Sequence, residues 1–282
     1  MRIETQGGGV RRLWDAELNP GAVGVAWLGQ AGFALRFGAL RILIDPYLSN
    51  SLAEKYRGAK YDHVRLMPAP MRPDEINELD FVLCSHRHSD HMDPGSLPFL
   101  AGRNRRCRFI VPSAEKDAAM KAGIALDRIE SVNASQTMKL TEDAELHILS
   151  AAHEEFKTNE RGEHHFLGFI FRLGKVVVYH SGDTVPYAGQ REALQAHSVR
   201  VALLPVNGRD EIRRSNGIAG NMTFEEALDL CVAAEVEWMI PHHFGMFAFN
   251  TIDRRELESH AAAANTVKCV EPRIEDWYLI DA

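Results

Sequence analysis

Short apolar runs separated by glycines open the patterned part of the chain. Residues 23–28, 33–37 and 40–44 are each dominated by apolar side chains, and glycines stand between them. Runs of this length bounded by turn residues are typical of β-strands. The pattern therefore predicts a β-meander that begins a first sheet. The preceding segment, 1–22, contains three consecutive glycines, and we expect it to be a partly flexible N-terminal extension.

Apolar runs and helical patterns then continue along the chain. We expect further strands at 81–84, 109–111, 136–140, 145–149, 166–171, 175–179, 201–204, 236–240 and 277–280, and helices at 96–100, 114–121 and 254–264. Ser113 is positioned to cap the second of these helices. Thr223 and Glu226 form a capping box that begins one more helix. Two runs of strands with helices between them predict a single α/β (α+β) domain over 1–282, with two packed sheets and helices outside them.

One long segment, 48–76, has no clear periodicity and is rich in Pro, Arg and Tyr. Long irregular connections inside compact domains are often binding loops, so we expect this segment to form part of a pocket rim. Tyr47, Tyr56, Tyr61 and His63 are candidates to face a substrate. Ordinary loop packing explains each of them equally well.

Metal-ligand side chains are concentrated directly after the run 81–84. His86, His88, Asp90 and His91 place three imidazoles and a carboxylate within six residues. A histidine-rich solvated loop is the alternative, but this density is far above a chance distribution of 13 histidines over 282 residues. Imidazole and carboxylate are the ligand types that bind zinc and similar ions. The set divides into two pairs, which suggests two metal ions.

Other candidate groups also follow predicted strands. His153 comes after the strand at 145–149, and Asp183 follows a glycine turn after 175–179. A carboxylate has two oxygens, so Asp183 could bridge two metals. Asp45 follows the third strand and could orient a metal-binding histidine, although an Asp-Pro turn without a chemical role is the alternative.

Composition and charge restrict the function classes. With 32 Lys and Arg against 39 Asp and Glu, the net charge of −7 argues against a nucleic-acid surface. The four cysteines have no C-x-x-C spacing, which fits neither a disulfide framework nor a thiolate zinc site. The chain contains no run of about 18 apolar residues that could span a membrane, and its N-terminal segment has no apolar core typical of a signal peptide. We therefore expect a cytoplasmic protein.

The arrangement His-x-His-x-Asp-His at 86–91 resembles the signature of the metallo-β-lactamase superfamily. The resemblance extends to Asp45-Pro46, His153, Ser181-Gly182-Asp183 and Pro241-His242-His243. It is closest to the branch that contains L-ascorbate-6-phosphate lactonase, because Tyr179-His180-Ser181-Gly182-Asp183, Gly220-Asn221-Met222 and Ile240-Pro241-His242-His243 are similar there. The resemblance implies a four-layer αββα sandwich.

The resemblance also implies how the site is divided between two divalent ions, zinc or manganese. One ion would be held by His86, His88 and His153, the other by Asp90, His91 and His243, with Asp183 shared and with Asp45, His180 and His242 as supporting residues behind the ligands. Two such ions lower the pKa of a water between them, which makes hydrolysis the natural chemistry. Asp90 would also carry the proton to the leaving oxygen, as family members use this position.

The substrate is expected to be a small molecule, and similarity to the lactonase branch favours a lactone or ester of a sugar acid. The candidate contacts are Asn207, Arg209, Asp210 and Asn221, since guanidinium and amide groups suit an anionic or hydroxyl-rich compound. A solvated loop is the alternative reading of Arg209 and its neighbours. A phosphodiesterase acting on a small organic phosphate is the second enzymatic hypothesis, and an iron redox site or an inactive metal-binding scaffold are the others. We also expect a homo-oligomer.

Overall fold

The computed structural model describes residues 1–264 and 266–282. Its strands form two sheets. In spatial order, the first sheet contains β1 (Arg2–Gly7), β15 (Asp276–Asp281), β2 (Val23–Gly29), β3 (Gly32–Phe37), β4 (Leu40–Ile44), β5 (Phe81–Leu83), β6 (Arg108–Pro112) and β7 (Ile129–Val132). The second contains β14 (Lys268–Cys269), β13 (Trp238–His242), β12 (Val201–Pro205), β11 (Val176–His180), β10 (Leu167–Leu173), β9 (Ala144–Ser150) and β8 (Thr137–Lys139).

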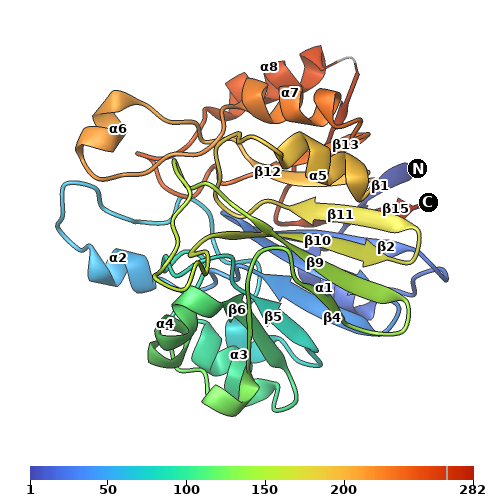
Figure 1. Cartoon of the computed structure of the whole chain (residues 1–282), viewed down its shortest axis with the longest axis horizontal. Coiled ribbons are helices and arrows are strands. Elements are labelled where there is room, and N and C mark those ends of the chain that lie inside the picture. Colours follow the sequence, from blue (N-terminus) through green and yellow to red (C-terminus); the bar gives the residue numbers. More distant parts are fainter. Residues whose placement is uncertain (265) are drawn as a thin grey trace.

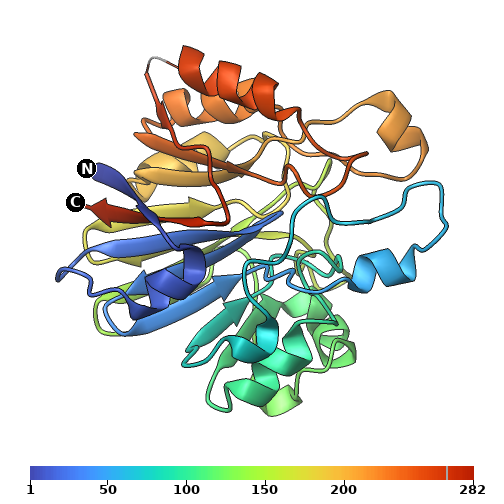
Figure 2. The same cartoon turned by 180° about the vertical axis from the view of Figure 1, so that it is seen from behind.

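Helices cover the outer faces of both sheets (Figures 1 and 2). The first sheet carries α1 (Gly9–Asp15), α3 (Leu97–Arg103) and α4 (Lys116–Lys121), and the second carries α5 (Gln190–Ala196), α7 (Phe224–Ala233) and α8 (Arg254–Ala263). Two short helices, α2 (Ser51–Lys55) and α6 (Glu211–Ser215), project from the same end of the molecule. The predicted four-layer αββα sandwich is confirmed.

The largest apolar cluster lies between the two sheets. Trp27 and Phe33 of the first sheet pack in the same cluster as Phe169 of the second, and all three are at most 2% exposed. A second cluster, which includes Leu13 and Phe109, joins the first sheet to its helices. Strand β2 is buried at every position because both of its faces are covered, which explains its continuous apolar run.

The N-terminal segment is part of the fold, so the prediction of a partly flexible extension was wrong. Strand β1 pairs antiparallel with β15 over its whole length, and Val10, Leu13 and Trp14 of α1 are buried. The glycines serve the turn between these elements. Gly9 has a φ of +54°, and a Cβ atom there would lie 2.6 Å from the Ile274 carbonyl oxygen.

Most of the predicted strands and helices are present within a few residues of their expected bounds, but β1, β7, β14, α1, α2, α5 and α6 were missed. Thr223 and Glu226 form the predicted capping box at the start of α7. The prediction for Ser113 was wrong, because Ser113 lies in a 3-10 turn and Glu115 occupies the N-cap of α4. Among the residues described, none of the helices has the length and apolar character that a membrane crossing requires.

The topology directs several strand ends to one edge of the sandwich. In the first sheet β4, β5 and β6 run parallel, and in the second β11, β12 and β13 do so. Strand β9 points the same way as β11, since both pair antiparallel with β10. The loops after β5, β9, β11 and β13 therefore gather at that edge, which is where polar residues of both halves can meet.

Candidate metal centre

The structure brings all seven predicted metal ligands together at this edge. Four follow β5, one follows β9, one follows β11 and one follows β13: His86, His88, Asp90, His91, His153, Asp183 and His243. Three groups of three ligand atoms each lie within 4.8 Å of one another: His86 with His88 and His153, His86 with His91 and Asp183, and Asp90 with His91 and His243. The first and third groups are the two sets that the sequence resemblance implied.

Asp183 lies between the two outer groups. Its Oδ1 is 3.4 Å from His91 Nε2, and its Oδ2 is 3.2 Å from His243 Nε2 and 3.8 Å from His153 Nε2. Gly182 places it there with a φ of +61°, and a Cβ atom on Gly182 would lie 2.6 Å from the Leu167 carbonyl oxygen. A larger residue would therefore push Asp183 away from both groups.

Several buried polar atoms of the cluster have no hydrogen-bond partner in the described part of the chain, which shows whether these residues fit metal ions. Within the described residues, His86 Nε2, His91 Nε2 and Asp183 Oδ1 are buried without a hydrogen-bond partner. Such atoms are costly in a folded protein unless something else binds them. Desolvation by the surrounding protein lowers the pKa of His88 to about 4, and it also brings the pKa of His86 below its ordinary value. The neutral imidazoles that result are the form that binds metals, so the residues fit.

The carboxylates in the cluster favour positive charge at its centre. Burial alone would raise the pKa of Asp183, but the adjacent imidazoles of His243 and His91 hold it well below the usual range. Burial likewise opposes charge on His91, but Asp183 and Asp45 outweigh it and raise the His91 pKa. A buried group of carboxylates that stabilises a cation in this way also suits a divalent ion.

Asp45 supports the cluster from behind. Its Oδ2 accepts hydrogen bonds from His91 Nδ1 at 2.8 Å and from the Ser85 hydroxyl at 2.6 Å, and its Oδ1 accepts one from the Ser85 backbone N–H at 2.7 Å. A carboxylate can only accept, so the Nδ1 atom of His91 carries the proton and Nε2 faces Asp183. Asp45 therefore orients the ring as a metal ligand requires.

Gln30 is a neighbour of the cluster that the sequence analysis missed. It lies in the turn between β2 and β3 with a φ of +52°, and it is fully buried. Its Nε2 donates to Asp90 Oδ2 at 2.9 Å and lies 3.2 Å from His243 Nε2, while its backbone oxygen accepts from the His243 N–H. The only sequence signal is a polar residue in a glycine-flanked turn at a strand end. Gln30 therefore links the first sheet to two candidate ligands.

The two remaining predicted supporting residues, His180 and His242, stack on one another with ring centroids 4.9 Å apart. His180 Nε2 lies 2.8 Å from the Ala31 carbonyl oxygen, and its Nδ1 accepts from the Gly182 N–H. Both ring nitrogens of His242 lack a partner among the described residues. His180 thus supports the turn that presents Asp183, and His242 packs behind it.

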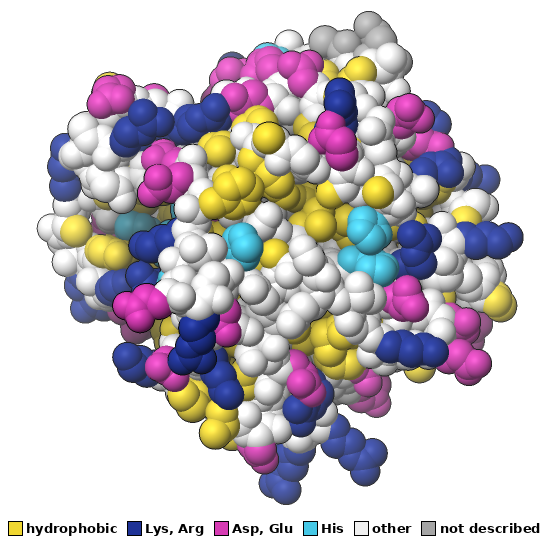
Figure 3. All heavy atoms as spheres, viewed as in Figure 1, with side chains coloured by type: hydrophobic (Ala, Val, Ile, Leu, Met, Phe, Trp, Pro, Cys, Tyr) yellow, Lys and Arg dark blue, Asp and Glu magenta, His cyan; other side chains and the backbone are white. Residues whose placement is uncertain are grey.

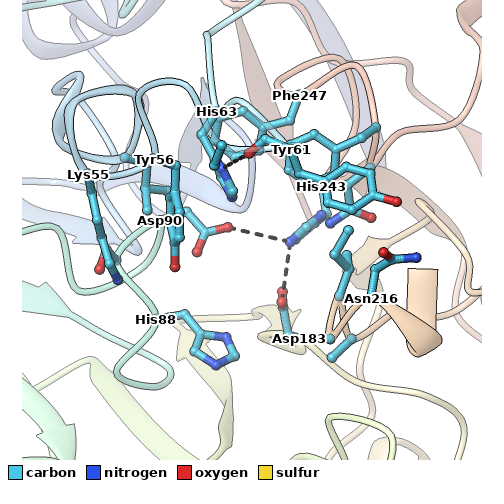
Figure 4. A pocket seen from close by; sticks show the side chains of 18 of the residues that line it. Lys55, Tyr56, Tyr61, His63, His88, Asp90, Asp183, Asn216, His243 and Phe247 are labelled. Atoms are coloured by element: carbon cyan, nitrogen blue, oxygen red, sulfur yellow. Dashed lines mark hydrogen bonds and ion pairs between the residues drawn. The ribbon is translucent and has the colours of Figure 1, made fainter.

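A cavity of about 680 Å³ opens above the metal cluster (Figure 4). It is lined by ligands of the cluster, by aromatic residues from 56–63 and 247–249, and by Lys55, Lys60 and Arg87. The segment 48–76 forms part of its rim, as predicted, and Tyr56, Tyr61 and His63 line it. Tyr47 does not, because it is buried beneath the guanidinium of Arg65.

The four predicted substrate contacts do not line this cavity. Arg209 forms a bidentate pair with Glu226, with both N···O distances at 2.6 Å. Asp210 caps α6, and the amide of Asn221 donates to Asn207. Asn221 Oδ1 is the exception, because it is buried without a hydrogen-bond partner among the described residues. The predicted contact residues therefore lie outside the cavity, and most of their polar groups bond within the fold.

Comparisons with known proteins identify the family. The profile of the beta-lactamase superfamily domain matches residues 40–244. The chain is 26% identical over 248 residues to a UPF0173 metal-dependent hydrolase of Pyrobaculum islandicum, covering 86% of this chain and 94% of that protein. It is also 29% identical over 165 residues, 56% of this chain and 33% of the other, to the mitochondrial N-acyl-phosphatidylethanolamine-hydrolyzing phospholipase D of Saccharomyces cerevisiae.

A solved structure has the same fold. Igni18, described as a metallo hydrolase from Ignicoccus hospitalis, superposes with a TM-score of 0.67 at 20% identity and covers 93% of this chain and 99% of its own. The family profile spans most of the chain, including the strands that end at the metal cluster. The chain therefore belongs to the metallo-β-lactamase superfamily of metal-dependent hydrolases.

Proposed function

We propose that this protein hydrolyses a small ester, either a lactone or a linear carboxylic ester, with two divalent metal ions held by the seven-residue cluster. The observation that carries the proposal is the convergence of these seven side chains, with unpartnered buried atoms among them, at the floor of a cavity large enough for a small molecule. His86, His88 and His153 would hold one ion, and Asp90, His91 and His243 the other. Asp183 would contact both.

Two divalent ions in this cluster would supply Lewis-acid polarisation of the ester carbonyl and would make a water molecule acidic enough to act as a nucleophile near neutral pH. The protein supplies orientation and proton transfer. Asp90 lines the cavity, and its Oδ2 is fixed by Gln30 at 2.9 Å. We assign to Asp90 the acceptance of the proton from the attacking water and its delivery to the leaving oxygen.

We do not propose a sugar acid as the substrate, because the four residues expected to bind it do not line the cavity. The link to the L-ascorbate-6-phosphate lactonase branch is therefore proposed only for the type of bond cleaved. A phosphodiesterase is the second candidate, and two observations favour it. The yeast relative is a phospholipase D, and Lys55, Lys60 and Arg87 line the cavity.

A substrate panel combined with metal control tests the proposal. The purified protein, a chelator-treated sample and samples reloaded with zinc or manganese would be assayed on lactones, linear esters and phosphodiesters. We expect ester or lactone hydrolysis that is lost with chelator and recovered with metal. Activity on phosphodiesters alone would establish the second candidate. A metal-loaded protein that cleaves neither class would overturn the proposal.

A further inference from the structure

The cavity has an aromatic wall formed by two segments that are distant in sequence. His63 stacks on Tyr56 with ring centroids 4.3 Å apart and meets Phe247 and Phe249 edge-on at 4.9 and 4.8 Å. Tyr61 packs against Phe249 at 5.2 Å. Tyr56, Tyr61, His63 and Phe247 are seen around the candidate ligands in Figure 4. The contacts among these rings hold the wall together without a substrate.

Positive charge lies beside this wall. Lys55 Nζ is 4.9 Å from the ring centre of Tyr56, and Lys60 Nζ is 5.0 Å from that of Tyr61. Over the described residues, neither lysine forms an ion pair with a carboxylate, and Lys60 Nζ donates to the neutral Asn216 Oδ1 at 2.8 Å. The only acidic side chains that line the cavity in the described part of the chain are Asp90 and Asp183 of the metal cluster. Figure 3 shows Lys and Arg side chains around a hollow at its left edge. This local excess of cations stands in a chain of net charge −7.

We propose that the substrate of this site carries a flat aromatic ring and a negatively charged group, both remote from the bond that is cleaved. The inference rests on the proposed function and specifies the compound that the site selects. An aromatic wall favours a ring, which can stack or meet the side chains edge-on. The ammonium groups of Lys55 and Lys60 have no carboxylate partner among the described residues, and Lys60 donates only to the neutral Asn216 Oδ1 at 2.8 Å, so both favour an anion next to that ring.

Four acetates separate the two features. They are 4-(acetoxymethyl)benzoate, benzyl acetate, trans-4-(acetoxymethyl)cyclohexanecarboxylate and cyclohexylmethyl acetate. All four have the same scissile acetate on a primary carbon, so their intrinsic reactivities are similar. Stacking should favour each aromatic ester over its saturated partner by about three- to tenfold in kcat/KM. Charge should favour each anionic ester over its neutral partner by about three- to fivefold for each lysine that is engaged.

Paired variants assign the preference to named residues. In the double variant Lys55→Met and Lys60→Met, KM for the two anionic esters should rise about tenfold while kcat and both neutral esters change little. Lys121→Met, an exposed lysine on α4 outside the cavity, is the matched control. Tyr61→Leu should reduce the aromatic preference and leave the charge preference. Equal kcat/KM for all four acetates, or a charge preference that survives the double variant, would overturn the inference.

Binding of the four corresponding alcohols, measured by calorimetry, separates this inference from the proposed function. The same order of affinity is expected, and its loss in the double lysine variant excludes simple coordination of the carboxylate by metal. If the alcohols follow this order but no ester is cleaved, the ester-hydrolase proposal fails and the inference on recognition stands. If all four alcohols bind equally, the inference fails whatever the enzyme cleaves.

Discussion

Replacing Asp45 with asparagine should impair metal binding without creating a cavity, because the two side chains have nearly the same volume. Both carboxylate oxygens of Asp45 accept hydrogen bonds, Oδ1 from the Ser85 backbone and Oδ2 from Ser85 and His91. An amide has one accepting oxygen and one donating nitrogen. If the nitrogen faces Ser85 N–H, two donors oppose one another. If it faces His91, then Nδ1 must become an acceptor, and the ring proton moves to Nε2, where it blocks the predicted metal-binding atom.

The size of the effect follows from this choice. Changes to residues that orient a metal-binding histidine typically cost about 10- to 100-fold in metal affinity, which corresponds to about 1.4 to 2.7 kcal/mol. In the metal-free protein, the loss of hydrogen bonds to a buried carboxylate should lower the free energy of unfolding by about 1.5 to 3 kcal/mol. We therefore expect Asp45→Asn to weaken one ion selectively and to lower stability.

The assay is a competition titration of metal-free protein against a chromophoric chelator, together with urea unfolding in the presence of EDTA. Asp93→Asn is the matched control, because Asp93 is also fully buried and accepts hydrogen bonds from Ser49, Ser51 and Ser96 without contacting a candidate ligand. The control should lose stability and retain metal affinity. Wild-type affinity for both ions in Asp45→Asn would refute the assignment of the His91 proton to Nδ1.

Three further predictions concern the metals, Asp90 and Arg209. Purified protein should contain about two divalent ions per chain, and chelation should lower its stability by about 2.7 kcal/mol for each ion removed, relative to protein in metal at 100 times the dissociation constant, as measured by thermal unfolding; no bound metal at neutral pH would contradict the dinuclear site. Asp90→Asn should reduce kcat about 10²- to 10⁴-fold, and wild-type turnover in a preparation that retains both metals would show that another group moves the proton. Arg209→Ala should leave kcat and KM unchanged and destabilise the fold by about 1 kcal/mol through loss of the partly exposed pair with Glu226, so a rise in KM would return Arg209 to the substrate site.

The parts of the site that the sequence predicted share a local signal. One compact motif contains His86, His88, Asp90 and His91. The other candidate ligands each follow an apolar run that forms a strand of the second sheet, and these strands end at the same edge. Strand β1 was missed because its burial alternates only weakly and its partner, β15, lies at the other end of the chain. No local pattern could show that pairing.

Long-range partners also explain the errors at the pocket. The sequence analysis treated Arg209 as a free guanidinium and Glu226 as a capping residue. In the structure Glu226 accepts hydrogen bonds both from the Thr223 backbone N–H and from Arg209. Gln30 had no distinguishing motif, since its importance comes from Asp90 and His243, which are 60 and 213 residues away. Residue type and spacing indicated which side chains would come together in the cluster, but they could not show which polar groups elsewhere were already bonded.

The position of β15 has a consequence for how the protein is made. This strand comes last among the described elements, yet it lies between β1 and β2, which are both synthesised before it. Until β15 has been synthesised, β1 has no partner strand and β2 has an unpaired edge, so the first sheet is incomplete. Exposed strand edges are sites of association between chains. Stalled or truncated translation products that lack residues 276–281 should therefore aggregate even though they contain every candidate metal ligand.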